Sequence, residues 1–493
     1  MTVDARAPVI VGVGQVNHEG GDAPEPVDLL ALASRNAASD AGSERILSAV
    51  QSIRVVRILS RRYRDPGALV AERIGARPAQ SAVSTDGGNS PQMLVNATAA
   101  AIQRGELDVA LVGGAESWKT RMAYKARGQS TPWTFQPDSV PPAEVIGARL
   151  PMSSDHEHSV GLGDPLQIYP LFETALRARH GWGVDEHRER MARLWAGFSA
   201  VGAANPWAAV RTRLDADAIS TPRPDNRMIG FPYTKLMCAN NSVDQAAALL
   251  LCSAGRAREL GVPPDRWVFV HSGAEAHDTP FVSNRFDLAS SPAIRAAGQA
   301  ALSLAGLSAG DVELVDLYSC FPSAVQVAAG ELGLSCDRDL TVTGGLTFAG
   351  GPWNNYVSHS VASMVLKLRD HGGARGLCSA NGGFLTKHAL GVYACDPPRR
   401  PFRLADVQAE VDALPVRPLA EAHDGPASIE AYTVMHRRDG EPERAFLACR
   451  LDDGRRAWAT TVDDGLVRSM TREEFCGRPV QLGPDRTVKE VIG

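Results

Sequence analysis

The chain has 493 residues, of which 51 are Lys or Arg and 56 are Asp or Glu, so its formal net charge is −5. With 44% hydrophobic and 22% charged residues, it has the composition of a globular protein, which excludes disorder, a coiled coil or a collagen-like fibre as a description of the whole. The mild acidity argues against nucleic acid as a partner, because phosphate contacts need clustered Lys and Arg. A single hydrophobic core stops growing at about 250 to 300 residues, so we expect at least two domains.

The sequence also limits where the protein works and what its cysteines do. No stretch approaches the roughly 20 apolar residues that a membrane span needs, so we expect no membrane insertion. The longest apolar run, Ala246–Cys252, predicts a buried helix. The N-terminal residues lack the features of a signal or transit peptide, which predicts a cytoplasmic protein. The eight cysteines form no CxxC pair and no cluster with metal-ligand spacing, so we expect reduced thiols and no metal site.

The first predicted elements alternate between strands and helices. Val9–Gly14 is a β-branched run typical of a strand, and Pro26–Ala41 has apolar residues at helical spacing that end at Gly42. Pro91–Arg104 is a second predicted helix, and Asp108–Gly113 is a continuous apolar run typical of a strand covered on both faces. This order predicts an α/β protein.

Periodicity fades between residues 118 and 231, where Pro, Trp, His and Arg accumulate. Long irregular segments inside compact proteins are more often functional covers than spacers, although packing alone would also explain this one. We therefore expect a loop domain here, with helices at Leu166–Arg179 and Asp185–Trp195.

The second half repeats the order of the first. Trp267–His271 and Val312–Leu317 are predicted strands, Ser360–Asp370 is a predicted helix, and Gly376–Ala380 is a predicted strand that leads into Asn381-Gly382-Gly383. The helix, strand and small-residue turn around DVALVGGAES return in GLCSANGGF. This similarity indicates an internal duplication.

The pattern changes again after Pro397. Ser428–His436, Arg444–Leu451 and Arg456–Val462 alternate apolar and polar residues, which is typical of half-buried strands. Asp-Gly pairs at 439–440 and 453–454 separate these runs, and a third turn of this type is predicted at 464–465. The last 90 or so residues are therefore predicted to form a separate antiparallel β module that resembles a small barrel.

Taken in order from Val9 to about Ala394, the motifs resemble those of the thiolases, and within them the sterol-carrier-protein type. VIVGVGQ resembles the opening strand of that family, and STDGGNSPQMLVNATAAAIQRGELDVALVGGAES resembles its nucleophile loop, helix and central strand. NNSVDQAAALLL is similar to the segment that ends the first half, and VELVDLYSCFPSA to the His-Asp-Cys-Phe region. GGLTFAGGPWNNYVSH is similar to the Gly-His-Pro loop, and SANGGF to the final glycine loop.

The resemblance implies an α/β thiolase fold, in which two βαβαβαββ halves pack in five layers around two buried helices. It divides the chain into an N-terminal half (1–117 and 232–262), a loop domain that covers the site (118–231), a C-terminal half (263–397) and the additional β-rich domain (398–493). It also implies an acyl-CoA or related thioester as substrate or ligand, with no other cofactor. Two copies of a thiolase pair through the strand next to the nucleophile loop, and the sequence neither confirms nor excludes such a homodimer.

The catalytic residues that the resemblance implies are changed in this chain. Thiolases carry the acyl group on a cysteine at a helix N-terminus, where the helix dipole favours the thiolate. That position is occupied by Gly88, and there is no cysteine between Met1 and Met237. Ser90, after Asn89, is a substitute only if a base activates it, yet the histidine of the family's His-Pro pair is replaced by Gly351.

Other positions survive in altered form. Where the family has His-Asp-Cys-Phe, this chain has Tyr318 to Phe321, so Cys320 is the one retained candidate for acid/base catalysis. Alternatively, Cys320 is a small buried residue that only packs in the core. Tyr318 is suited to donate a hydrogen bond to an oxyanion, and with Tyr356 it is similar to the tyrosines of thiolase-like aldolases of steroid side-chain breakdown. Both tyrosines have the alternative of a core role.

We expect the ligand to contact Gly88, Asn89, Ser90, Gly351 and the loop Asn381, Gly382 and Gly383. In the family, that last loop supplies a backbone amide and a polar side chain to the thioester oxygen, while the alternative is a simple glycine turn. His359 and His388 lie near these loops as further bases, and no spacing argument favours either of them over a packing role.

Three hypotheses follow. The first is a thiolase-like protein that binds acyl-CoA without the ordinary thiolase reaction. The second is a lyase that performs retro-aldol cleavage, or an acyltransferase, that uses Tyr318, Cys320 and Tyr356. The third is a scaffold that recruits a protein partner through residues 398–493.

Overall fold

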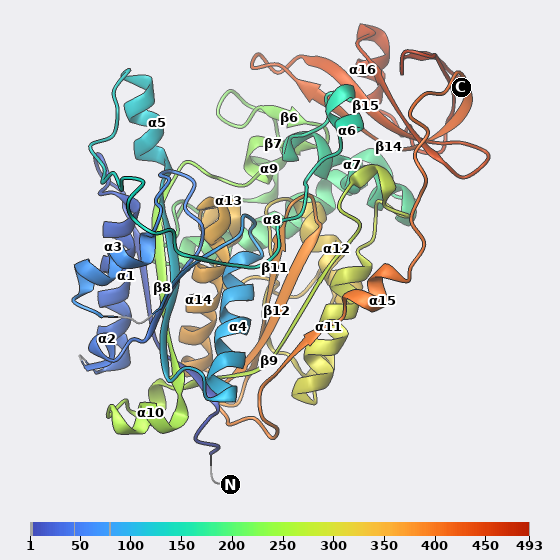
Figure 1. The fold of residues 1–493 in the computed structure, drawn as a ribbon. Helices are drawn as coiled ribbons and strands as arrows, with labels where there is room; N and C mark the ends of the chain where they lie inside the picture. The colour runs from blue at the N-terminus through green and yellow to red at the C-terminus, as the bar shows by residue number, and fades with distance from the viewer. Residues whose placement is uncertain (1–2, 44, 78–79, 493) are drawn as a thin grey trace.

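The computed structural model describes residues 3–43, 45–77 and 80–492, and its main body has two similar halves (Figure 1). The N-terminal half contains, in chain order, β1 (Pro8–Asn17), α1 (Pro26–Ala41), α2 (Arg45–Ser48), β2 (Ser52–Val55), α3 (Pro66–Ile74), β3 (Gln80–Ser84), α4 (Ser90–Arg104), β4 (Val109–Ser117) and, after the cover, β8 (Asp244–Ser253) and α10 (Ala254–Glu259).

The C-terminal half repeats this strand-and-helix order, with an irregular segment before α14 where the first half has its third strand. It contains η2 (Pro264–Arg266), β9 (Val268–His277), η3 (Val282–Asn284), α11 (Pro292–Ala305), η4 (Ala309–Asp311), β10 (Leu314–Asp316), α12 (Pro322–Leu332), α13 (Gly345–Phe348), η5 (Trp353–Asn355), α14 (Tyr356–Asp370), β11 (Arg375–Gly382) and β12 (Lys387–Ala394).

Five layers result from the packing of these halves. α1 packs against β1 and β8 and forms one outer layer, and α11 packs against β9 and β12 and forms the other. Between the two sheets lie α4, which contacts β4 and β12, and α14, which contacts β8 and β11 (Figure 1). A short pairing of β1 with β9 joins both sheets into one. The predicted duplicated five-layer fold is therefore confirmed.

The helix ends follow the local sequence. α1 begins at Pro26 and α4 has Pro91 in its first turn, where the missing N–H of proline costs nothing because first-turn amides have no partner within the helix. Gly42 and Gly105 end these helices with φ of 66° and 81°, a left-handed conformation that suits glycine. The predictions of these helices, and of the strands that became β1 and β4, are confirmed.

The prediction of a buried helix at Ala246–Cys252 is wrong. These residues form the centre of β8, which pairs antiparallel with both β1 and β4. Every residue of β8 is buried, so both faces of the strand are apolar and the run lacks the alternation of a half-buried strand. A short continuous apolar run fits a buried strand and a buried helix equally well. No helix in the described part of the chain is long and apolar enough to cross a membrane.

The predicted cover contains mostly short elements and two long helices, α7 and α8, which confirm the two helices expected there. Its elements are α5 (Trp118–Ala126), β5 (Glu144–Ile146), α6 (Asp155–Val160), α7 (Pro165–His180), α8 (Val184–Ala204), α9 (Ala216–Ser220) and β6 (Met228–Gly230). β7 (Tyr233–Thr234) and η1 (Lys235–Met237) follow in the segment that returns to the N-terminal half.

One strand of the cover bears on the expected pairing of two copies. β5 lies parallel to β3, with Val145 opposite Val83 and Ile146 opposite Ser84. β3 leads into the loop at Gly88, and β5 occupies the edge of β3 that does not pair with β2. A second copy therefore finds that edge of β3 already hydrogen-bonded.

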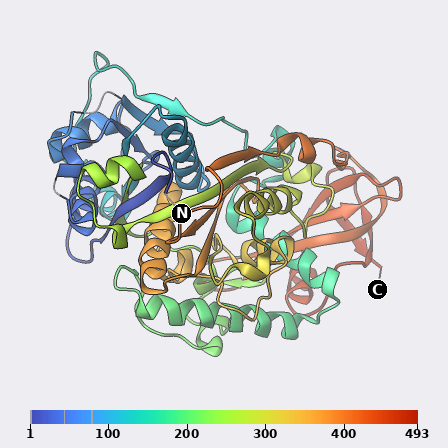
Figure 2. The same cartoon turned by 90° about the horizontal axis from the view of Figure 1, so that it is seen from below.

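The additional domain forms a second sheet in the strand order β16-β15-β14-β17-β18, with β6 and β7 attached through β14. A bridge between Thr460 and Thr487 draws the two ends together, so the sheet is barrel-like without being a closed barrel. Figure 2 shows this domain at the opposite end of the molecule from the N-terminal half. Its elements are β13 (Arg403–Asp406), which pairs with β9 of the body, α15 (Gln408–Asp412), β14 (Gly425–His436), β15 (Pro442–Arg450), β16 (Arg456–Thr461), α16 (Asp464–Met470), β17 (Pro479–Leu482) and β18 (Val488–Val491).

Of the three turns predicted from Asp-Gly pairs in this domain, two are confirmed and one is wrong. Gly440 and Gly454 adopt φ of 91° and 86° in the turns that join β14 to β15 and β15 to β16. Asp464-Gly465 instead begins α16, because the preceding Asp463 accepts a hydrogen bond from the Leu466 amide and caps a helix.

Candidate functional site

Three segments from the two halves meet at Gly88, which lies between β3 and α4: the loop of Gly88 itself, the segment after β10 and the end of β11. A Cβ atom added to Gly88 would be 2.3 Å from Tyr318 Oη and 2.5 Å from the Asn381 carbonyl oxygen, closer than real Cβ atoms approach other atoms. The structure thus brings together three predicted site residues that are far apart in the sequence. The phenol of Tyr318 occupies the space in which a nucleophilic side chain at position 88 would begin.

The next residues of this loop also contact the final glycine loop. A Cβ at Gly382 would lie 2.3 Å from Asn89 Oδ1, which is buried and has no hydrogen-bond partner among the described residues. Lys387 donates to the Asp86 carbonyl, and burial lowers the pKa of this lysine. Sequence reasoning missed Lys387, which follows the SANGGF motif without a motif of its own.

Ser90 is in a position that suits packing of the loop. Its side chain is buried, and its hydroxyl donates to the Thr85 carbonyl oxygen at 2.8 Å. That bond closes the turn that leads into α4 and directs the hydroxyl toward the backbone of its own loop.

Cys320 lies beside Asn381, whose Nδ2 is 4.0 Å from the cysteine Sγ. Burial raises the pKa of Cys320 to about 12, so the side chain is a neutral thiol at physiological pH. Burial also raises the pKa of Tyr318, which keeps its phenol protonated and able to donate a hydrogen bond. The predicted acid/base role of Cys320 stays a prediction.

A tyrosine of the cover completes this cluster and was missed by sequence reasoning. Tyr169 on α7 is buried, and its ring stacks on Phe321 with centroids 4.6 Å apart. Its Oη accepts hydrogen bonds from Asn381 Nδ2 at 2.9 Å and from the Leu385 amide at 3.0 Å, and donates to the Gly383 carbonyl at 3.1 Å. One phenol therefore holds the shape of the final glycine loop.

Tyr356 lies near Tyr318, but its hydroxyl is engaged elsewhere. The two rings meet edge to face with centroids 5.6 Å apart. Tyr356 Oη donates to Asp316 Oδ1 at 3.0 Å and lies 2.7 Å from Thr343 Oγ1. These bonds suit a core role, and the catalytic role of Tyr356 stays a prediction.

Gly351 contacts the segment that precedes β8 in the N-terminal half. Its amide donates to the Asn240 carbonyl at 2.9 Å, and a Cβ there would be 2.8 Å from Asn241 Oδ1. The loop of Gly351 also reaches the nucleophile loop through Asn354, whose Oδ1 accepts a hydrogen bond from the Gly87 amide at 3.0 Å. The predicted ligand contact of Gly351 therefore stays a prediction.

The two histidines differ in their surroundings. His359 is bonded to Gln15 Oε1 at 2.9 Å, and burial lowers the pKa of His359 to about 3, so it is a neutral core residue. His388 on β12 faces Asn381 across the β11–β12 pair and lines a cavity of about 10 Å³ together with Tyr318 and Asn381. Its Nε2 lies 3.4 Å from Asp278 Oδ2. Of the two, His388 is the one that borders the site.

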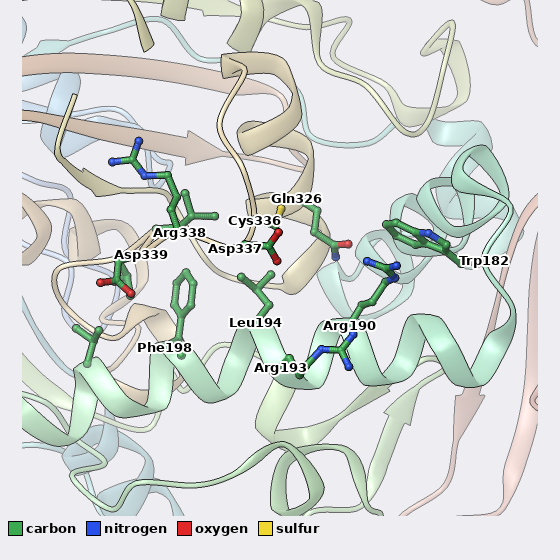
Figure 3. Close-up of a pocket in the computed structure, with 14 residues that line it drawn as sticks. Trp182, Arg190, Arg193, Leu194, Phe198, Gln326, Cys336, Asp337, Arg338 and Asp339 are labelled. Carbon is green, nitrogen blue, oxygen red and sulfur yellow. The ribbon is translucent and has the colours of Figure 1, made fainter. Parts of the chain in front are cut away.

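A larger cavity lies elsewhere. Its volume is about 320 Å³, and it lies between α8 and residues 336–341, with Trp182, Arg190 and Arg193 along one side (Figure 3). It shares no lining residue with the cluster around Gly88. Within residues 3–43, 45–77 and 80–492, no group of three or more His, Cys, Asp or Glu side chains is placed to hold a metal ion.

Comparisons with known proteins agree with this architecture. The family model described as the thiolase-like protein type 1 additional C-terminal domain matches residues 406–487. An acetyl-CoA acetyltransferase of Methanothermobacter thermautotrophicus is 27% identical over 255 residues, which are 48% of this chain and 63% of that protein. The matched part thus spans less than two thirds of that relative.

Solved structures extend the likeness to the whole chain. The crystal structure of a monomeric SCP2-thiolase like protein type 1 from Mycobacterium smegmatis is 34% identical, covers 99% of both chains and has a TM-score of 0.84. The Ltp2-ChsH2(DUF35) aldolase is 18% identical with a TM-score of 0.58, covering 79% of this chain and 98% of that one. Human mitochondrial 3-ketoacyl-CoA thiolase is 18% identical with a TM-score of 0.56, covering 79% of this chain and 99% of that one, and these two likenesses show the fold alone. From its full-length likeness to the mycobacterial protein and from its additional domain, the chain belongs to the SCP2-thiolase-like proteins of type 1.

Proposed function

We propose that this protein binds an acyl-CoA or related thioester between its two halves and the cover, and that it does not form the acyl-enzyme of a thiolase. The observation that carries the proposal is the 2.3 Å separation between Tyr318 Oη and a Cβ built on Gly88. The site has lost its nucleophile, and a phenol has taken its place. Only a movement of both Tyr318 and the backbone at Asn381 would make room for a cysteine.

The test combines binding with turnover. Isothermal titration of the full chain with acetyl-CoA is expected to show binding, while acetoacetyl-CoA plus CoA is expected to give no acetyl-CoA. Ser90→Ala and Cys320→Ser serve as variants of the substitute nucleophile and of the candidate acid/base residue. Steady production of acetyl-CoA that is lost in either variant would overturn the proposal, and so would an absence of binding.

A lyase is the second candidate, favoured by the position of the protonated Tyr318 phenol beside Gly88 and Cys320. Such a phenol is suited to stabilise the enolate left when a 3-hydroxyacyl-CoA is cleaved. Tyr318→Phe is expected to abolish that cleavage with ligand affinity within a few fold of the wild type. Unchanged turnover counts against this candidate, and Tyr356→Phe tests separately whether a second phenol takes part.

The third candidate function is the recruitment of a protein partner through residues 398–493. The fold neighbour described as the Ltp2-ChsH2(DUF35) aldolase is a complex of two proteins, and the additional domain is a covalently attached module on a related body. Co-purification of the full chain is expected to yield a partner that is lost when the exposed Val462 on this domain is changed to Glu. A partner retained by the variant would argue against that face.

A further inference from the structure

A cavity of about 10 Å³ lies beside the place expected for the thioester. Its polar lining comes from Tyr318, Ser379, Asn381 and His388, and the rest is apolar. A volume of about 10 to 15 Å³ by this measure holds one water molecule. Tyr318 and Asn381 border both this cavity and the space at Gly88, so the cavity adjoins the site proposed for acyl-CoA.

Asn381 indicates what the cavity holds. Its Nδ2 donates to Tyr169 Oη at 2.9 Å, but its Oδ1 is buried and has no donor among the residues that the structure describes. Buried amide oxygens are almost always hydrogen-bonded, and a donor must therefore come from outside the chain. A water in a cavity of this size supplies it.

His388 is held in the orientation of a base. Its Nε2 lies 3.2 Å from the Leu385 carbonyl oxygen, 3.3 Å from Ser291 Oγ and 3.4 Å from Asp278 Oδ2. Asp278 also accepts hydrogen bonds from the Ala293 amide at 3.1 Å and from Ser291 Oγ. A carbonyl oxygen and a carboxylate, which both only accept, face Nε2, so that nitrogen is the donor and Nδ1 is left to accept a proton.

Asp278 is ionised in its buried place. Burial alone would raise the pKa of Asp278, but the charge of Arg285, 3.8 Å away, and the hydrogen bonds of His388 and Ser291 together lower it. His388 is therefore a base that the carboxylate of Asp278 orients. It lines a cavity large enough for one water molecule.

We infer that His388, oriented by Asp278, activates a water in this cavity to attack the thioester of a bound acyl-CoA, so that the protein is an acyl-CoA hydrolase. This inference rests on the proposed binding of acyl-CoA. Because Gly88 cannot accept the acyl group, we expect water to attack the thioester carbon directly.

The reaction balances with acyl-CoA and water as the only reactants. His388 Nδ1 takes a proton from the water, and the water oxygen forms a bond to the thioester carbon. The electron pair of the carbonyl moves to its oxygen, to which the Tyr318 hydroxyl donates a hydrogen bond. When that pair returns, the C–S bond breaks and the thiolate takes the proton from His388. The products are a carboxylic acid and free CoA.

The experiment measures binding and hydrolysis in parallel on the full chain. Acetyl-CoA and a longer acyl-CoA are used as probes, free CoA is followed with a thiol-reactive dye, and affinity is measured by isothermal titration. The wild type is expected to bind and to release CoA, and intact mass spectrometry is expected to show no acyl adduct on the protein. Binding without release overturns this inference alone, whereas no binding overturns the proposed function as well.

Variants test the two roles separately. His388→Gln is expected to lower kcat at least about 100-fold with affinity within threefold, as for loss of a general base. Asp278→Asn is expected to lower kcat with KM unchanged, because Asp278 positions His388 without touching the substrate. His371→Gln, at an exposed helix end, is the matched control and is expected to match the wild type. Full hydrolysis by folded His388→Gln overturns the inference, and if that variant does not fold, unchanged kcat of Asp278→Asn does so.

Discussion

Replacing Arg456 by Met is expected to weaken the attachment of the additional domain to the body. The side chain is fully buried, and its Nε and Nη2 donate to Glu430 at 2.8 and 2.9 Å. Nη1 donates to the carbonyl oxygens of Val282, Ser283 and Arg285 at 3.1, 2.9 and 2.7 Å. One guanidinium therefore joins β16 to the segment that follows β9, and methionine fills its volume without any of these donors.

The size of the effect follows from burial. Breaking a buried ion pair by removing one partner costs about 3 to 5 kcal/mol. In Arg456→Met, Glu430 keeps only the half-exposed Arg450, at 3.2 Å, and three buried carbonyl oxygens lose their donor. Arg455 is the matched control, since it is the neighbouring residue and pairs with Asp453 at 2.7 Å on the surface, where both side chains are about half exposed. Such exposed pairs contribute about 0 to 1 kcal/mol, so Arg455→Met is expected to change little.

Urea unfolding followed by tryptophan fluorescence measures both variants. We expect the first transition of Arg456→Met to lose about 3 to 5 kcal/mol, and limited proteolysis to cleave it faster between the body and β14. A difference of less than about 1 kcal/mol between the two variants would refute the reasoning.

The pH dependence provides a second check on the same pair. Burial alone would raise the pKa of Glu430, but the hydrogen bonds and charge of Arg456, with Arg450, lower it below its ordinary value of 4.5. A carboxylate with a lowered pKa in the folded state stabilises the protein above pH about 4.5, and this stability is lost as the pH falls through the folded pKa. The gap between wild type and Arg456→Met is therefore expected to narrow below pH about 4.

Three further changes test the site and its edges. Gly88→Cys is expected to lower the melting temperature without producing thiolysis of acetoacetyl-CoA, because its Cβ would lie 2.3 Å from Tyr318 Oη. Replacing residues 144–146 by Gly-Ser-Gly weakens β5 and is expected to produce concentration-dependent dimers, measured by light scattering after size-exclusion chromatography. His359→Gln is expected to reduce the loss of unfolding free energy between pH 6.5 and 4, because burial lowers the pKa of His359 to about 3 and only the unfolded chain takes up that proton.

For each of these three predictions, one outcome would contradict the reasoning. Thiolysis by Gly88→Cys would mean that Tyr318 moves aside at little cost. A strictly monomeric β5 variant would mean that the edge of β3 is protected by other parts of the cover. If wild type and His359→Gln lose stability equally between pH 6.5 and 4, another group causes the acid sensitivity; one buried neutral histidine accounts for at most about 1.4 kcal/mol per pH unit.

The elements that were predicted correctly are those whose signals lie within a few residues. Pro26 and Gly42 mark the ends of α1, and the Asp-Gly turns at 439–440 and 453–454 mark two hairpins. Ala246–Cys252 failed because an apolar run of this length does not distinguish a strand from a helix. Its structure depended on β1 and β4 pairing on both sides, which no local pattern contains.

Which residues lie together at Gly88 was predictable where a motif gives a position, and not where a contact comes from another layer. Gly88 and Asn381 follow from the order of the motifs, and the structure places them together. Tyr169 lies 212 positions before Asn381 in a segment without a motif, yet its hydroxyl bonds to that side chain. Asp278 directly follows β9 and His388 lies on β12, so the two side chains meet only because these strands pair.

The sequence alone was enough to predict the duplicated α/β body and two hairpins of the additional domain, and it shows that no cysteine precedes Cys238, because these follow from neighbouring residues or from a residue type that is missing. Only the tertiary structure decided that a phenol fills the space at Gly88, that β5 covers the edge of β3 and that Arg456 ties the additional domain to the body. Such contacts join segments that are far apart in the chain. They exist only once the layers have packed, and packing depends on the shape of every neighbour at once.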